Sequence, residues 1–145
     1  MGQFIATKVA GSDSGLRDAL VAANLPTEDL TDGGRRFFRF DLDGRPVGYG
    51  GFEPHGAYAL LRSVVVLPEA RGTGVGRAVA EGVLQKAAAE KCSEAFLLTT
   101  TAEGFFQHIG FHEIDRALAP KEILATKQAA TICATATLLA RRLDG

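Results

Sequence analysis

Residues 58–91, YALLRSVVVLPEARGTGVGRAVAEGVLQKAAAEK, contain the pattern that decides the fold of this chain. Residues 60–67 are apolar at all but two positions, and their three consecutive valines are typical of a buried β-strand. Pro68 ends that strand because it has no backbone N–H to donate. Residues 71–77 then open a helix in which apolar side chains recur at helical spacing from Val79 to Ala87. We therefore predict a strand, a glycine-rich turn and a long helix.

A strand that leads through glycines into a helix forms a site suited to an anion. The first amides of the helix have no intrahelical partner, the helix dipole adds partial positive charge, and the missing side chains let a phosphate approach. The spacing G-x-G-x-G at residues 72–76 differs from the dinucleotide fingerprint G-x-G-x-x-G. Arg77 and Ala78 stand where a P-loop would have Lys and Ser or Thr, so neither of these two nucleotide sites is predicted.

The composition is that of an ordinary globular protein. Apolar residues make up 46% and charged residues 23% of the 145 positions, which excludes a disordered chain and fits one domain, residues 1–145. The formal net charge of −1 gives no general attraction to nucleic acid or to an anionic membrane, so neither is an expected partner. No signal-peptide pattern or membrane-length apolar run is present, and the two cysteines have no metal-binding spacing. We expect a cytoplasmic protein without a metal.

The other elements are predicted from periodicity and turn residues. Asp43-Gly44 is a strong signal for a tight hairpin. The resulting alternation of strands and helices predicts an α/β (α+β) protein with a mixed sheet whose faces are covered by helices. The expected strands are 3–9, 36–42, 46–53, 95–101, 111–115 and 135–143, and the expected helices are 12–23, 103–109 and 120–130. By propensity, residues 134–140 fit a helix equally well.

Two motifs resemble those of the GNAT superfamily of N-acetyltransferases. Residues 71–76, RGTGVG, have the form R-x-x-G-x-G of its acetyl-CoA-binding segment, and V-V-x-P precedes them. Residues 105–111, FFQHIGF, resemble a later aromatic-rich helix that ends in Gly-Phe. The resemblance covers nearly the whole chain and implies the GNAT fold: a mixed, mostly antiparallel seven-stranded sheet with splayed central strands, flanked by helices. Tight packing alone is the alternative explanation of the glycine turn.

The resemblance implies acetyl-CoA as cosubstrate and a small-molecule amine as acceptor. Amides of the glycine turn would hold the pyrophosphate, and the strand before it would offer its backbone to the pantetheine arm. A backbone N–H near Val64 or Val65 would stabilise the oxyanion, and Val64 is the catalytic candidate. The implied cofactor-binding residues are Val64, Val65, Val66, Arg71, Gly72, Thr73, Gly74, Val75, Gly76, Arg77 and Phe105.

The acceptor amine must lose a proton before it can attack the thioester. Glu53 and His55 are the candidate bases, acting directly or through water. Phe106 stands where many family members carry a tyrosine acid, and a phenyl ring cannot donate a proton. Thr99 and Thr100 stand near a common asparagine position; a hydroxyl there would bind substrate or pantetheine, whereas the alternative is ordinary strand-forming threonines.

Arg62 lies in an otherwise apolar strand, where an unpaired charge is costly. One hypothesis is that it clamps the carboxylate of the acceptor, on the same strand face as Val64. The alternative is an ion pair with Glu53 or with another acid of the sheet.

The segments LLRSVVV and LLTTTAEGFF, with residues 125–136, resemble a narrower branch of arsenic-resistance N-acetyltransferases. That resemblance implies detoxification of a glutamate-like amine such as arsinothricin or a phosphorus analogue. Cys133 invites an arsenic–thiolate role, although a lone cysteine is usually a small apolar residue. Two alternatives stay open: acetylation of a protein N-terminus or lysine, and a non-catalytic acyl-CoA-binding domain, which Phe106 favours. Homodimers are common in the superfamily, so a homodimer also stays open.

Overall fold

A tight hairpin joins β2 (Arg36–Leu42) to β3 (Arg45–His55) in the computed structural model of the chain, which describes residues 2–126, 129 and 136–143. Asp43 and Gly44 have φ values of 52° and 82°. Two successive positive φ values belong to the two-residue turns whose twist matches that of antiparallel strands. The hairpin signal in the sequence is thus confirmed.

The order of helices and strands is the predicted one, with bounds that differ at the ends. The other strands are β1 (Phe4–Val9), β4 (Tyr58–Val66), β5 (Glu94–Thr99), β6 (His112–Glu113) and β7 (Thr137–Arg142). The helices are α1 (Ser14–Ala22), α2 (Val75–Ala89), α3 (Glu103–His108) and α4 (Lys121–Leu124), with 3₁₀ turns at Pro68–Ala70 and Arg116–Leu118. The strand predicted at 111–115 has two residues, and the helix predicted at 120–130 has four, its predicted end lying outside the described residues.

The strands form a seven-stranded sheet in the order β1-β2-β3-β4-β5-β7-β6. β4 and β5 pair in parallel over three residue pairs, from Tyr58↔Glu94 to Leu60↔Phe96. The pairs β1–β2, β2–β3, β5–β7 and β6–β7 are antiparallel. The predicted mixed and mostly antiparallel sheet, flanked by helices, is therefore confirmed.

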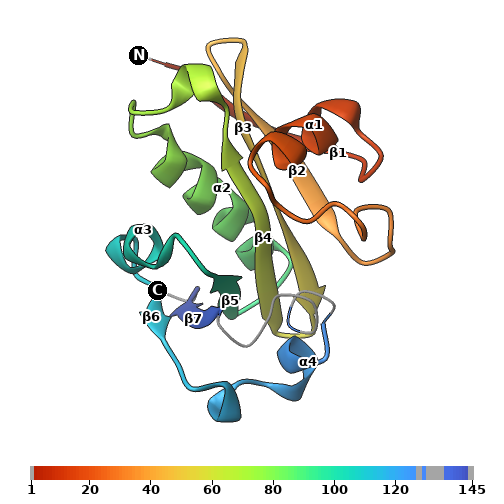
Figure 1. Cartoon of the computed structure of the whole chain (residues 1–145), viewed down its shortest axis with the longest axis vertical. Helices are drawn as coiled ribbons and strands as arrows, with labels where there is room; N and C mark the ends of the chain where they lie inside the picture. The colour runs from red at the N-terminus through yellow and green to blue at the C-terminus, as the bar shows by residue number, and fades with distance from the viewer. Residues whose placement is uncertain (1, 127–128, 130–135, 144–145) are drawn as a thin grey trace. The chain divides into compact units, whose positions relative to one another are not determined.

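The chain divides into two compact units. Unit 1 contains Met1–Glu53 and Leu61–Lys86, and unit 2 contains Pro54–Leu60 and Ala87–Gly145. In unit 1, α1 and α2 lie on opposite sides of β3 (Figure 1). Leu16 and Leu20 of α1 pack with Phe37, Tyr49 and Val65 in one buried cluster on the α1 side.

On the other face of unit 1, glycines let α2 approach β3 closely. A methyl group added at Gly50 would lie 2.6 Å from Cγ2 of Val83, and one at Gly48 would lie 3.1 Å from Cγ2 of Val79. Gly82 of α2 makes a similar close contact with β2, since a methyl group there would lie 2.5 Å from the ring of Phe40. The helix α2 therefore packs on β2 and β3 at a separation that side chains at these glycine positions would prevent.

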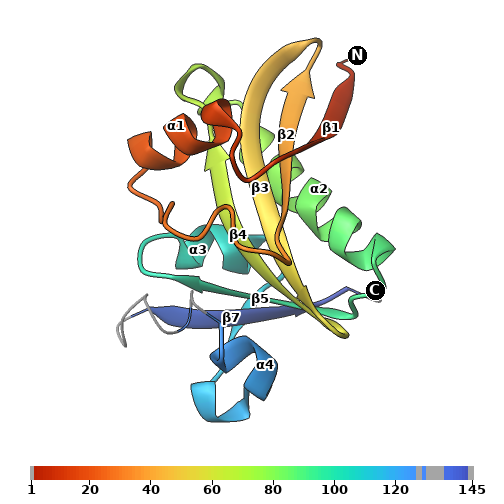
Figure 2. The ribbon, with the colours of Figure 1, turned by 90° about the vertical axis from the view of Figure 1, so that its right-hand side faces the viewer.

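In unit 2, β7 lies between β5 and β6, and β5 and β7 run side by side (Figure 2). Leu60, Phe96, Ile123, Leu138 and Ala140 form its buried cluster, so the single turn of α4 is held by Ile123, which is fully buried.

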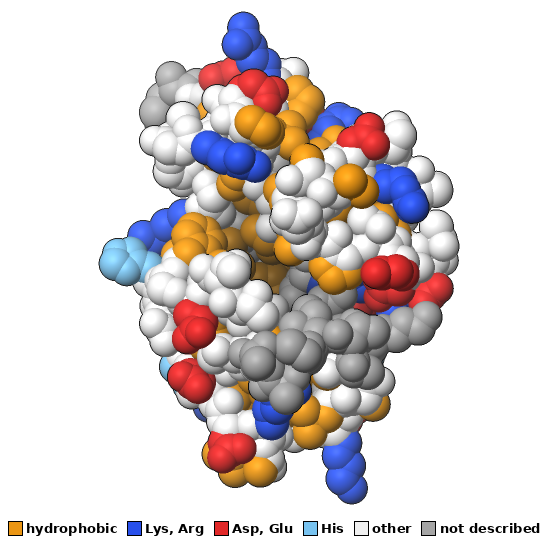
Figure 3. All heavy atoms as spheres, viewed as in Figure 1, with side chains coloured by type: hydrophobic (Ala, Val, Ile, Leu, Met, Phe, Trp, Pro, Cys, Tyr) orange, Lys and Arg blue, Asp and Glu red, His pale blue; other side chains and the backbone are white. Residues whose placement is uncertain are grey.

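Charges of both signs are interspersed on the face of the molecule seen in Figure 3. This distribution agrees with the near-zero net charge of the sequence. In the part of the chain that the structure describes, no helix has the length and hydropathy needed to cross a bilayer.

The close approach of α2 to β3 can be tested by adding a methyl group. We expect Gly50→Ala to lower the free energy of unfolding by about 2 kcal/mol, because the buried Val83 cannot move aside without strain. Gly33→Ala is the matched control, because no described atom lies within 4 Å of a methyl group there. Urea unfolding measures both, and equal midpoints for the two variants would contradict the packing.

Candidate functional site

The glycine-rich turn leaves β4 through a 3₁₀ turn and enters α2. Gly72 and Gly74 have φ values of 81° and 80°, a left-handed conformation that a side chain would strain. The Thr73 hydroxyl donates to the carbonyl oxygen of Ala70 at 2.5 Å and holds the turn to the residue before it. The helix itself begins at Val75, whose side chain is buried. Its first turn thus follows directly on two left-handed glycines.

The space over this turn suits an anionic group. No described atom lies within 4 Å of a methyl group built at Gly72 or Gly74. Residues 71–74 and Arg77 are exposed, and the first turn of α2 carries no acidic side chain. The guanidinium of Arg71 already makes one hydrogen bond within the protein, because its Nε donates to the carbonyl oxygen of Val66 at 3.2 Å. The residues present therefore fit the pyrophosphate of coenzyme A at the N-terminus of α2.

The strand before the turn contains an irregularity that the sequence did not indicate. Ser63, within β4, has a φ of 58°. Val65 belongs to the cluster on the α1 side, and the guanidinium of Arg62 lies 5.5 Å from the centre of the Phe37 ring in the same cluster. In a regular strand, residues three apart face opposite sides. The left-handed Ser63 supplies the extra residue, as in a β-bulge.

The bulge overturns one inference from strand alternation. Val64 lies on the α2 side, because its Cγ2 is 3.6 Å from a methyl group built at Gly50, beside Val79 and Val83. Arg62 lies on the α1 side with Phe37. The prediction that Arg62 and Val64 share a face was therefore wrong, since the two-residue repeat fails across Ser63.

Arg62 is at the centre of a buried cluster of charges in unit 1. Its side chain is 1% exposed. Nη1 and Nη2 each lie 2.7 Å from an oxygen of Asp29, and Nη1 also lies 2.8 Å from Glu53. Arg35 adds a further bond to Asp29 at 2.9 Å. Two guanidinium groups thus face two buried carboxylates.

These contacts change the acidity of the groups in the cluster. Hydrogen bonds from Arg62 hold the pKa of Asp29 far below its ordinary value, against the upward effect of burial, and Arg35 adds to the lowering. Burial lowers the pKa of Arg62, but its hydrogen bonds to Asp29 and Glu53 outweigh that effect and raise it overall. The pairing therefore compensates the cost of burying the charges.

Arg62 thus forms an ion pair with Glu53, which was the alternative to its binding the carboxylate of the acceptor. To clamp a substrate carboxylate, Arg62 would have to release Asp29 or Glu53 and leave that carboxylate buried without its partner. Glu53 is itself only 2% exposed and holds Arg62. Its carboxylate is thus a member of the charged cluster in this structure, which does not support its use as a base.

The candidate residues of unit 2 lie at the ends of its strands. His55 is half-buried at the end of β3. Thr99 ends β5, and its hydroxyl oxygen accepts from the backbone N–H of Ala102 at 3.0 Å and of Thr101 at 3.3 Å. The Thr99 hydroxyl therefore holds the turn between β5 and α3, whereas Thr100 is exposed.

The two phenylalanines of α3 differ in burial. Phe105 is 41% exposed, whereas Phe106 is 8% exposed. The Phe106 ring packs edge-on against Phe105 at 5.0 Å and against Phe111 at 5.6 Å between ring centres. The side chain at the usual tyrosine position is thus part of an aromatic core in unit 2.

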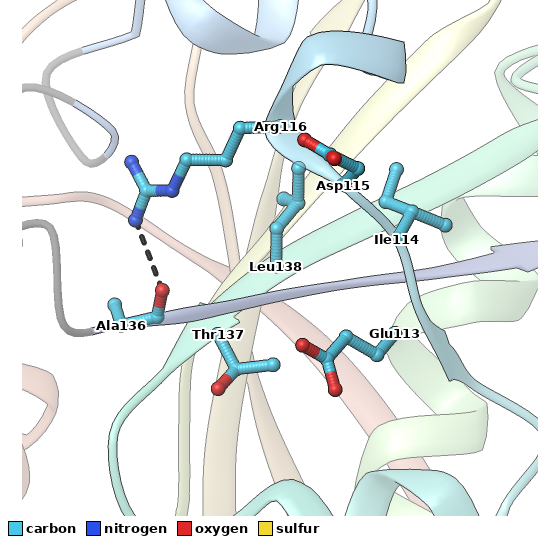
Figure 4. Close-up of a pocket in the computed structure, with 7 residues that line it drawn as sticks. All are labelled: Glu113, Ile114, Asp115, Arg116, Ala136, Thr137 and Leu138. Atoms are coloured by element: carbon cyan, nitrogen blue, oxygen red, sulfur yellow. Dashed lines mark hydrogen bonds between the residues drawn. The ribbon is translucent and has the colours of Figure 1, made fainter.

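A separate cavity of about 630 Å³ lies beside β6 and β7 in unit 2 (Figure 4). Two of its lining residues are joined by a hydrogen bond, in which Nη2 of Arg116 donates to the carbonyl oxygen of Ala136 at 3.0 Å. The lining residues are Glu113, Ile114, Asp115, Arg116, Ala136, Thr137 and Leu138, none of which is a predicted site residue. Cys133 lies outside the described residues, and so does most of the C-terminal segment that resembles the arsenic-resistance branch.

Sequence reasoning missed Asp29, Arg35 and the conformation of Ser63. Asp29 stands in a polar loop, 33 residues before Arg62, and its neighbours give no sign that it is buried. The only available signal was Arg62 itself, because a charge in an apolar strand requires a partner. Serine has no preference for a left-handed conformation, so nothing at position 63 predicts the bulge.

The charged cluster should give the protein a distinct acid dependence. Because the pKa of Asp29 is lower in the folded state, its stabilising effect is present above the unfolded value of about 4 and is lost as the pH falls below it. We expect Asp29→Asn to cost about 3 kcal/mol near neutral pH, where Arg62 loses a buried partner.

Urea unfolding at several pH values measures this effect. The difference between wild type and Asp29→Asn should shrink as the pH falls below about 4. Asp18→Asn removes an exposed carboxylate of α1 and is the control. A loss with Asp29→Asn that is the same at all pH values would rule out the ionised pair as its cause.

Known proteins resemble this chain in sequence and in fold. An uncharacterised N-acetyltransferase of Chlorobaculum tepidum is 32% identical over 97 residues, which are 66% of this chain and 62% of that protein. The match therefore spans less than two thirds of that relative.

Two solved structures illustrate the similarity of fold. N-acetylglutamate synthase of Neisseria gonorrhoeae, complexed with coenzyme A and N-acetyl-glutamate, has a TM-score of 0.73 at 16% identity, covering 96% of this chain and 35% of that chain. Rv2747 of Mycobacterium tuberculosis, in complex with CoA, has a TM-score of 0.70 at 19% identity, covering 95% and 98% of the two chains. A sequence profile described as the acetyltransferase (GNAT) family matches residues 12–113, well over half of the sequence. The chain belongs to the acetyltransferase (GNAT) family.

Proposed function

We propose that this protein is an acetyl-CoA-dependent N-acetyltransferase that acts on a small amino-acid-like amine. The observation that carries the proposal is the pair of exposed left-handed glycines, Gly72 and Gly74, directly before a 15-residue helix. Family membership supports the same cofactor, and two structures with similar folds contain coenzyme A.

The residues of the turn would bind and orient the cofactor. Amides from Gly72 to Arg77 donate to the pyrophosphate, and the exposed side chain of Arg77 adds positive charge. Val64, Val65 and Val66 present the strand backbone to the pantetheine arm, and the N–H of Val64 donates to the acyl oxygen. When bound, acetyl-CoA supplies the thioester that reacts with the amine.

The amine must be deprotonated by a group of this chain or by water that such a group holds. We assign this role to His55 rather than to Glu53. His55 is half-buried, whereas Glu53 is 2% exposed and holds Arg62. No acid is assigned to the departing thiolate, because Phe106 has no proton to donate.

For the acceptor we propose glutamate or a glutamate analogue, with arsinothricin and its phosphorus analogue phosphinothricin as candidates. The support is the resemblance of residues 60–66 and 97–106 to the arsenic-resistance branch. Acetylation of a peptide amine is the competing activity, and acyl-CoA binding without turnover is the competing non-enzymatic function, which the buried Phe106 favours.

Release of free thiol from acetyl-CoA tests the acceptor. We expect turnover with at least one of glutamate, phosphinothricin and arsinothricin, and none with peptides that carry a free N-terminus or lysine. Turnover with peptides alone would show that the acceptor is a peptide amine and not a small amino acid. Acetyl-CoA binding without turnover on any amine would favour the non-enzymatic function.

The glycine turn has its own test in acetyl-CoA affinity. Gly74→Ala should raise the dissociation constant of acetyl-CoA about tenfold, because a side chain strains the left-handed turn and enters the open space over it. Gly44→Ala introduces the same strain at a φ of 82° in the β2–β3 hairpin and should leave the affinity unchanged. Calorimetric titration measures both constants, and equal losses of affinity would place the cofactor elsewhere.

A further inference from the structure

The left-handed conformation of Ser63 needs a cause, because serine does not favour it. The φ of 58° lies inside a strand that is otherwise extended. An L-residue populates this region about tenfold less than glycine does. Such strain persists only where surrounding contacts fix the residue.

Arg62 supplies such a contact, and it is itself immobilised. Nε of Arg62 donates to the hydroxyl oxygen of Ser63 at 3.1 Å. The other two nitrogens of the guanidinium are held by both oxygens of Asp29 at 2.7 Å and by Glu53 at 2.8 Å. The planar guanidinium has little freedom to turn, so its Nε is a fixed donor next to the strained residue.

The conformation of Ser63 also sets which way the next residues point. Arg62 and Val65 share the α1 side, and Val64 faces α2. If Ser63 returned to an extended conformation, strand alternation would move Val64 to the α1 side and Val65 to the α2 side. The backbone groups of 64–66 would be reversed with the side chains.

We propose that Asp29, acting through Arg62, holds Ser63 in its left-handed conformation and thereby sets the orientation of the Val64–Val66 backbone that binds acetyl-CoA. Asp29, Arg62 and Ser63 are then positioning residues and do not contact the acceptor. The part that concerns acetyl-CoA rests on the proposed function, whereas the control of Ser63 by Asp29 does not. The buried charges thus act on cofactor binding through one backbone torsion.

The torsion can be measured without any ligand. The three-bond HN–Hα coupling and the Cα and Cβ chemical shifts of Ser63 report its φ by NMR. We expect left-handed values in the wild type and a shift toward extended values in Asp29→Asn. Asp18→Asn, an exposed change on α1, should leave them unchanged.

A glycine rescue separates positioning from general destabilisation. Asp29→Asn should weaken acetyl-CoA binding about tenfold, the factor by which the left-handed state of serine is disfavoured. Adding Ser63→Gly to that variant should restore most of the affinity, because glycine adopts the left-handed conformation without the contact from Arg62. The double variant should remain as unstable to urea as Asp29→Asn.

A second pair of variants leaves the charges in place. Ser63→Asn should retain acetyl-CoA affinity, since asparagine tolerates the left-handed region, and Ser63→Val should lose at least tenfold, since a β-branched residue does not. These variants serve if Asp29→Asn does not stay folded by circular dichroism at the titration temperature.

The outcomes are distinct from those for the proposed function. If the wild type does not bind acetyl-CoA, the proposed function is refuted. The NMR comparison then still tests whether Asp29 controls the conformation of Ser63. Unchanged Ser63 couplings in Asp29→Asn would overturn the inference, as would a double variant that regains no affinity, or Ser63→Val binding as well as Ser63→Asn.

Discussion

The pairing of Arg62 with Asp29 is the interaction on which unit 1 depends most. A guanidinium whose side chain is 1% exposed is tolerated only if carboxylates and hydrogen bonds replace its water. Asp29 comes from the loop between α1 and β2, and Glu53 comes from β3. One buried cation therefore joins a loop that lies 33 residues away in the sequence to the consecutive strands β3 and β4. The polar loop is held by charge in addition to the apolar contact of Leu30, which is 2% exposed.

The sequence was informative where the signal is local. Asp43-Gly44 predicted its hairpin because two positive φ values are demanded by the turn, and the glycines at 72–76 predicted a turn between a strand and a helix. The sequence offered Glu53 as a possible partner of Arg62, and the structure contains that pair, but Asp29 could not be identified, because pairing across 33 residues leaves no trace in either segment. Nothing in residues 60–67 distinguishes Ser63 from an ordinary strand residue, so strand alternation wrongly predicted that Arg62 and Val64 share one face. The candidate roles of His55, Thr99 and Thr100 are still predictions.

The same contrast between local and long-range signals explains why the class of cofactor can be inferred from the sequence more readily than the acceptor. A pyrophosphate is bound largely by backbone amides, and the glycines that expose those amides occupy fixed positions in one short segment. An acceptor is recognised by side chains that the fold gathers from several segments. A charged side chain such as Arg62 can instead be paired within the protein, which leaves it unable to bind the acceptor. Phe106 adds a second example, since its ring packs against Phe105 and Phe111 where a hydroxyl would otherwise be expected. Family membership thus constrains the binding of coenzyme A more tightly than it constrains the chemistry performed on it.

The position of β1 in the sheet affects the order in which the parts of unit 1 unfold locally. It is the first strand of the sheet, it pairs with β2 alone, and none of its residues is buried. Releasing it breaks one ladder of hydrogen bonds but exposes little apolar surface, so its opening requires much less than the full free energy of unfolding. Its amide protons should exchange with solvent long before those of Phe37 and Phe40 in the adjoining strand, whose side chains are buried. We therefore expect β1 to open before β2 without breaking the contacts of the buried charges, none of which comes from β1.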